Sequence, residues 1–160
     1  MSETQAQPQI NLLRMYLKGA SLEHPAAPVA FLDDSGTPVQ DKLDLQVSVN
    51  VVAEGLFEVA VRATLTLSRE NKAMLVLEGE QAGLFQLTDV PAEDIDGVLG
   101  VNAAAMVYGY LRVNFADLMT RATLPPVHLP EINWLEQHQA RVAQMVAAQG
   151  RPAAANESMH

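Results

Sequence analysis

The chain contains 160 residues, of which 49% are apolar and only 5% aromatic, and its formal net charge is −9. A single domain of this length can bury a substantial core. Because cysteine is absent from the sequence, disulfide bonds and thiolate chemistry are excluded. The negative charge, with no cluster of lysine or arginine, repels phosphate backbones, so we expect no nucleic-acid partner.

The sequence contains no run of eighteen apolar residues, so direct membrane insertion is not expected. Residues Met1 to Gln9 are polar and lack the apolar stretch of a signal peptide, which makes the cytoplasm the expected location. We expect flexible residues 1–8, one domain over residues 9–150 and a disordered tail over residues 151–160.

The first half of the chain has the alternating pattern of β-strands. Residues 9–22 are apolar on both faces, which predicts a strand covered by its own domain and also by a second partner. Residues 24–40 contain three prolines and form a long crossover, so the first strand is not expected to make a simple hairpin with the second. Residues 42–51, 57–68 and 73–81 then predict a three-stranded antiparallel meander.

The second half changes to helical spacing. Pro91, followed by acidic residues, predicts a helix start, and Asn102 is expected to cap a second, longer helix. Residues 124–130 form a proline-rich extended connection. Asn133, with a glutamate three positions later, predicts the start of a last helix that ends at Gly150. The two halves together predict an α+β fold with helices packed on one face of an antiparallel sheet.

No residue pattern in the sequence indicates catalysis or metal binding. The four histidines are far apart and match no zinc-ligand spacing, and the sequence lacks phosphate-binding glycine loops and the nucleophile elbow of hydrolases. The acidic clusters Asp33-Asp34 and Glu93-Asp94 fall in a loop and in a first helical turn, where solvation and helix capping explain them. We therefore expect a protein that is not an enzyme, with no catalytic residue, metal or cofactor.

Apolar side chains occur where loops are expected. Phe31 and Leu32 lie in the crossover, while the proline-rich connection carries Leu124, Val127 and Leu129, with Trp134 just beyond. Each of them could fill the core from its loop. Together they could instead line a groove for an extended polypeptide. On pattern alone, both interpretations stay open.

Several short blocks of sequence, in their order and spacing, resemble the SecB family of export chaperones. The similarity extends over roughly residues 10–142. The blocks are residues 14–18, 21–25, 27–28 with Phe31, 42–45, 57–59, 62–66, 81–85, 99–100 with Tyr110 and Arg112, 124–129, and 132–134.

The resemblance implies a four-stranded antiparallel sheet with a long crossover, helices packed on one face, and dimers joined through the first strand that pair into a homotetramer. It also implies an ATP-independent holdase that binds unfolded precursor polypeptides and delivers them to the SecA motor ATPase. The positions that match the family's client-binding groove are Phe31, Leu43, Leu45, Leu124 and Trp134. Those that match its motor-docking face are Glu23, Val76 and Glu78.

The sequence departs from the family pattern at Gly19 and Val113, where the family has acidic residues, and at Gly109, where it has proline. The main alternative is therefore a SecB-like chaperone dedicated to one client, such as a toxin–antitoxin partner, with weak or no motor binding. A small-molecule enzyme or binding protein that uses the crevice between sheet and helices, and a purely structural oligomer, are further alternatives.

Overall fold

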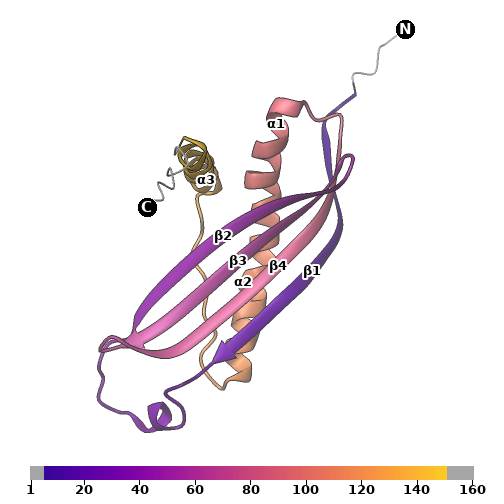
Figure 1. Ribbon diagram of the computed structural model, residues 1–160. Coiled ribbons are helices and arrows are strands. Elements are labelled where there is room, and N and C mark those ends of the chain that lie inside the picture. Colours follow the sequence, from indigo (N-terminus) through magenta and orange to yellow (C-terminus); the bar gives the residue numbers. More distant parts are fainter. Residues whose placement is uncertain (1–5, 151–160) are drawn as a thin grey trace, which may run out of the picture.

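A four-stranded antiparallel sheet forms one layer of the molecule, as the computed structural model shows (Figure 1). The structure describes residues 6–150, so the predicted tail over residues 151–160 and most of the predicted flexible N-terminus lie outside the described residues. The strands are β1 (Gln9–Glu23), β2 (Gln40–Ala53), β3 (Leu56–Arg69) and β4 (Lys72–Thr88). Their order in the sheet is β1-β4-β3-β2.

Strands β2, β3 and β4 form the predicted meander. A two-residue turn separates β3 from β4, and its residues Glu70 and Asn71 both have positive φ, at 49° and 62°. Positive φ at both positions is the conformation that matches the twist of a tight hairpin. Strand β1 pairs with β4 at the far edge of the sheet. The crossover after β1 therefore carries the chain past two strands to β2, which confirms that β1 and β2 do not form a hairpin.

One long helix covers a single face of this sheet. It consists of α1 (Ala92–Gly97), the π-helical segment η2 (Val98–Ala103) and α2 (Ala104–Arg121), and it runs behind the strands in Figure 1. The prediction that Asn102 caps a separate helix is wrong. The backbone stays helical through Ala103, with φ −66° and ψ −43°, so no free helix end exists at that position.

The last helix, α3 (Trp134–Gln149), lies beyond the β2 edge of the sheet (Figure 1). Its predicted start is confirmed, because the Asn133 side chain accepts a hydrogen bond from the backbone N–H of Glu136 at 3.2 Å. Gly150 caps the opposite end. No residue of α3 is buried, so the rest of the chain holds this helix by few contacts. No helix within residues 6–150 is long and apolar enough to cross a membrane.

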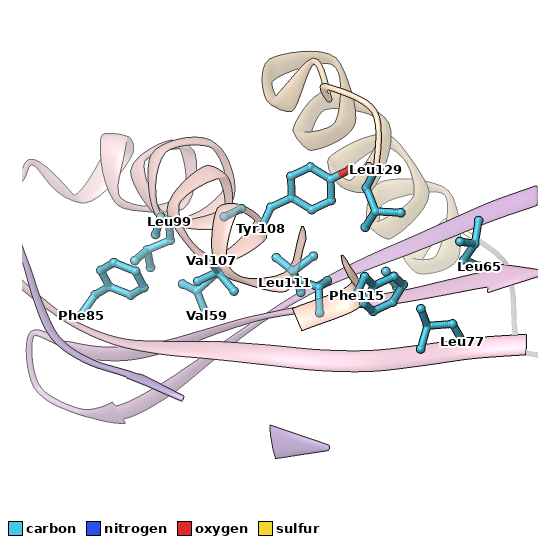
Figure 2. Packing of buried hydrophobic residues seen from close by; sticks show 14 of the residues in the cluster. Val59, Leu65, Leu77, Phe85, Leu99, Val107, Tyr108, Leu111, Phe115 and Leu129 are labelled. Carbon is cyan, nitrogen blue, oxygen red and sulfur yellow. The ribbon is translucent and has the colours of Figure 1, made fainter. Parts of the chain in front are cut away.

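The core fills the space between the sheet and the long helix (Figure 2). Two glycines of β4 make room for aromatic rings: a Cβ atom on Gly79 would lie 2.7 Å from the ring of Phe115 on the helix, and one on Gly83 would lie 2.6 Å from the ring of Phe85 on the same strand. Both distances are shorter than atomic contact permits, so the rings pack directly on the strand backbone. The largest fully buried side chains are Phe85, Phe115, Leu75, Leu77, Leu99, Leu111, Leu129, Val59, Val61 and Val107.

Candidate functional site

The crossover holds Phe31 at the molecular surface. Residues Val29–Leu32 form the 3-10 helix η1, and the Phe31 ring lies 5.3 Å from the His24 ring, centroid to centroid. An ion pair between Asp33 and Arg69 ties the end of this segment to β3. Phe31 remains 51% exposed and Leu32 81% exposed. Exposure of large apolar side chains in a segment that is tied in place indicates a surface available to a partner.

The crossover also forms one wall of a cleft of about 600 Å³. The opposite wall comes from the end of the β3–β4 hairpin, and it includes Arg69, Ala73 and Met74. The crossover wall is made almost wholly of small apolar residues, namely Pro25, Ala26, Ala27, Val29 and Ala30.

Leu43 and Leu45 lie on the helix-facing side of β2. Their partners in the register are Leu65 and Ala63 of β3, which are buried core residues. Both leucines pack against the core cluster and are only partly buried, because β2 is an edge strand. They are therefore neither sealed in the core nor free at the surface.

Leu124 and Trp134 lie at the two ends of the connection between α2 and α3. Each is partly buried against the same core cluster as Leu43 and Leu45. Trp134 stacks edge-on against Tyr108, with ring centroids 5.2 Å apart, and the Tyr108 hydroxyl donates to the Pro130 carbonyl at 2.6 Å. The structure thus brings four of the five predicted groove residues to one cluster and leaves Phe31 apart from it.

The sequence left open whether the apolar residues of the proline-rich connection fill the core or line a groove. Leu129 fills the core. It is only 2% exposed and belongs to the cluster of buried side chains drawn in Figure 2. A loop residue that is buried in this way anchors the whole connection along α2. Leu124 and Val127, which precede it in the connection, remain partly exposed.

The three predicted docking residues share the face of the sheet that no helix covers. Glu23 lies opposite Val76 in the β1–β4 register, and Glu78 follows two residues along β4, so its side chain points to the same side. Glu78 forms an ion pair with Arg62 of β3. The register also places Gly19 opposite Glu80 on this face, with open space where a side chain on Gly19 would stand.

A polar network that sequence patterns did not reveal lies at the centre of this open face. Glu58 accepts hydrogen bonds from the Tyr16 hydroxyl, from Lys18 Nζ at 3.1 Å and from Asn50 Nδ2 at 3.4 Å. The Tyr16 side chain crosses from β1 to β3 over Ala82, which is fully buried although it is on the open face. Tyr16 and Lys18 of β1 lie 42 and 40 positions from Glu58 of β3, so no local sequence motif predicts the network.

The network shifts the pKa values of its members in opposite directions. Burial, followed by the hydrogen bond to Glu58, raises the pKa of Tyr16 to about 12. The hydrogen bond from Tyr16 is the largest cause that lowers the pKa of Glu58 below its ordinary value of 4.5. Both shifts favour the arrangement of a neutral tyrosine donating to an ionised glutamate.

We predict that Tyr16→Phe lowers the free energy of unfolding at pH 7 by about 1–2 kcal/mol, because it removes a partly buried hydrogen bond to a charged acceptor. The folded-state pKa of Glu58 is depressed, so its contribution is present above the unfolded-state pKa and is lost as pH falls through the folded-state value. The difference between the two proteins should therefore shrink as pH falls below 4.5, the ordinary pKa of a glutamate. Urea titrations at pH 7 and pH 3.5 measure it, and a difference that is equal at both pH values would contradict this role of Glu58.

The chemistry of these surfaces is that of binding. Within residues 6–150, no group of three or more histidine, cysteine, aspartate or glutamate side chains is arranged to hold a metal ion. The exposed groups on one side of the molecule are apolar side chains around an edge strand and a crossover. On the open sheet face they are paired charges and a neutral tyrosine. Such surfaces recognise a polypeptide through apolar burial, backbone hydrogen bonds and charge.

Comparisons with known proteins agree with this assessment. The family model described as "Preprotein translocase subunit SecB" matches residues 3–145. The protein-export protein SecB of Bordetella pertussis is 43% identical over 153 residues, which cover 93% of this chain and 83% of the relative. That of Burkholderia cenocepacia is 38% identical over 156 residues, covering 98% of this chain and 94% of the relative.

A solved structure shares the fold at low sequence identity. It is a SecB-like chaperone of Mycobacterium tuberculosis in complex with a peptide of the HigA1 antitoxin, with a TM-score of 0.65 and 18% identity. The match covers 78% of this chain and 91% of the other. At this identity the match supports the α+β fold with its open four-stranded antiparallel sheet.

The family match and the curated relatives place the chain in a class of export chaperones, which are not enzymes. The chain belongs to the SecB family of protein-export chaperones, which confirms the resemblance found in the sequence.

Proposed function

We propose that the protein is an ATP-independent holdase of the cytoplasm, which binds unfolded secretory precursors and delivers them to the SecA motor. One observation carries the proposal: Phe31 is half exposed in a crossover that an ion pair holds in place. Residues 9–150 form the chaperone domain. No nucleotide is required, because binding uses the apolar surface that the folded chain already presents.

Client binding would combine apolar burial with backbone pairing. Leu43, Leu45, Leu124 and Trp134 offer partly exposed apolar surface against the core, and Phe31 offers a second, separate apolar surface in the crossover. Each large apolar client side chain that becomes fully buried contributes about 1.5–3 kcal/mol. The free edge of β2 can pair with an extended client as an added strand. Apolar burial and backbone pairing both allow clients of many different sequences to bind.

Motor docking would use the open sheet face. Glu23, Val76 and Glu78 stand together there and combine acidic and apolar character. The resemblance implies that this face meets a small, zinc-bearing, basic tail of the motor. Opposite charge on the two surfaces favours their encounter and fixes their register.

The assembly we propose is a dimer of dimers. Strand β1 is a sheet edge with apolar side chains left open: Leu12, Leu13 and Leu17 are 40%, 51% and 47% exposed. An exposed, apolar edge strand is a strong candidate for pairing with a second copy. The exposed side of α2 carries Met106, Tyr110 and Val113 at helical spacing, and this stripe would join two dimers into the homotetramer.

A chaperone dedicated to one client, such as a toxin–antitoxin partner, is the second candidate. The open space at Gly19 favours it, because the family's acidic residue at this position is missing from the docking face. In that case the client-binding surface would be retained and motor binding would be weak or absent.

The client proposal predicts that Phe31→Ala weakens binding of an unfolded precursor about three- to tenfold, since roughly half of a large apolar side chain is lost from the contact surface. Fluorescence anisotropy with a labelled, permanently unfolded precursor gives the dissociation constant. The matched control is Val51→Ala, which truncates a side chain that is 73% exposed at the opposite end of β2. Equal affinities for the two variants would refute the assignment of Phe31.

A further inference from the structure

Besides the packing of Trp134 on Tyr108, the side-chain polar contacts between helix α3 and the rest of the described domain converge on a single carboxylate. Asp96 at the end of α1 receives Arg141 Nη2 at 3.1 Å and lies 3.5 Å from His138 Nε2. Arg141 also donates to His138 Nδ1 at 3.2 Å. The ring proton of a neutral His138 is therefore on Nε2, which faces Asp96. We call Asp96, His138 and Arg141 the Asp96 cluster.

The backbone beneath the Asp96 cluster is shaped to receive it. Gly100 of η2 is buried, and a Cβ atom there would lie 2.4 Å from His138 Nδ1 and 3.0 Å from Arg141 Nη2. Only glycine lets the two side chains lie on the helix backbone at this point. The side chains of His138 and Arg141 are just 13% and 20% exposed, whereas Asp96 is 61% exposed, so a surface carboxylate holds two largely shielded side chains in place.

Helix α3 forms one wall of a cleft of about 440 Å³ whose other wall is the edge strand β2 with the neighbouring part of β3. His138, Arg141 and Gln144 line it from the helix, and Leu45 and Val47 line it from β2. Since α3 buries no residue of its own, the Asp96 cluster is the chief polar contact that sets where this wall stands.

We propose that Asp96 is a positioning residue for client binding: it fixes α3 as the wall that faces β2 and so sets the width of the cleft in which an extended client is retained. The inference rests on the proposed chaperone function and deepens it. Loss of the carboxylate leaves the Arg141 guanidinium, mostly shielded from water, without a counter-charge, and α3 then moves outward to hydrate it.

The test compares Asp96→Asn with Asp94→Asn, which removes the same charge from the same helix at a residue that makes no ion pair among the described residues. Asp96→Asn should release a labelled unfolded precursor about three- to tenfold faster, as expected when a retaining wall loosens. Trp134, the only tryptophan of the chain and the first residue of α3, should become more accessible to acrylamide quenching. Asp94→Asn should change neither measurement.

A second variant is expected to displace α3 without removing a charge. Gly100→Ala favours the helical backbone but displaces His138, so it should reproduce the faster release and the greater quenching. Equal release rates for Asp96→Asn and Asp94→Asn would overturn the inference, as would greater quenching in Asp96→Asn without faster release. Failure of the unmodified protein to bind the precursor would instead refute the proposed function itself.

Discussion

Replacement of Phe115 by alanine is expected to lower the free energy of unfolding by about 3–5 kcal/mol. The ring is fully buried and packs on the backbone of β4 at Gly79, so its removal leaves a cavity between helix and sheet that neither layer can fill without moving. Urea unfolding followed by circular dichroism, at one fixed protein concentration, gives the difference.

The control for this truncation is Phe31→Ala, which deletes the same side chain from a position that is 51% exposed. Its effect on the free energy of unfolding should stay within roughly 0.5 kcal/mol, as is usual for surface substitutions. Similar unfolding midpoints for the two variants would show that the helix–sheet core is not built around Phe115.

Charge reversal at Glu78 is expected to weaken binding of the zinc-loaded C-terminal tail of the motor at least tenfold. Lysine at this position would repel the basic tail and would also face Arg62, the present partner of Glu78. Like charges brought together at an interface cost several kcal/mol. Isothermal titration calorimetry of Glu78→Lys against the unmodified protein measures the loss.

Glu54→Lys is the matched control, because it makes the same reversal at an exposed turn between β2 and β3, away from the proposed docking residues. It should bind the tail as the unmodified protein does. Absence of tail binding in the unmodified protein would favour the client-dedicated alternative, and equal losses in both variants would mean that net charge and not the docking face governs the contact.

Much of the fold could be predicted because its signals are local. Strict alternation identified the meander. The apolar character of both faces of β1 predicted a strand covered by its own domain and by a second partner, and that partner stays a prediction. The cap at Asn133 was predictable for the same reason, since donor and acceptor lie three residues apart. The predicted helix start at Asn102 was wrong, because the presence of a capping residue does not show whether the backbone before it is already helical.

The features that sequence patterns missed depend on contacts between distant segments. Asp96 and Arg141 are 45 positions apart, and Tyr16 and Glu58 are 42 positions apart, so neither pair forms a motif. For the same reason, the sequence could not predict which apolar residues of the loops are buried and which stay exposed. Leu129 became core and Leu124 remained partly exposed although both immediately precede a proline in one connection, because only the packed structure determines which side of the connection faces the sheet.

The most direct test of the account is whether the pure protein holds a non-native chain without nucleotide. A secretory precursor unfolded in urea should be diluted into buffer with increasing amounts of the protein and no ATP, while light scattering records aggregation. We predict that scattering falls steadily as the protein is added and vanishes near stoichiometric amounts, with the precursor recovered in a complex by gel filtration. Aggregation at an unchanged rate, with the precursor absent from the chaperone fraction, would contradict the account.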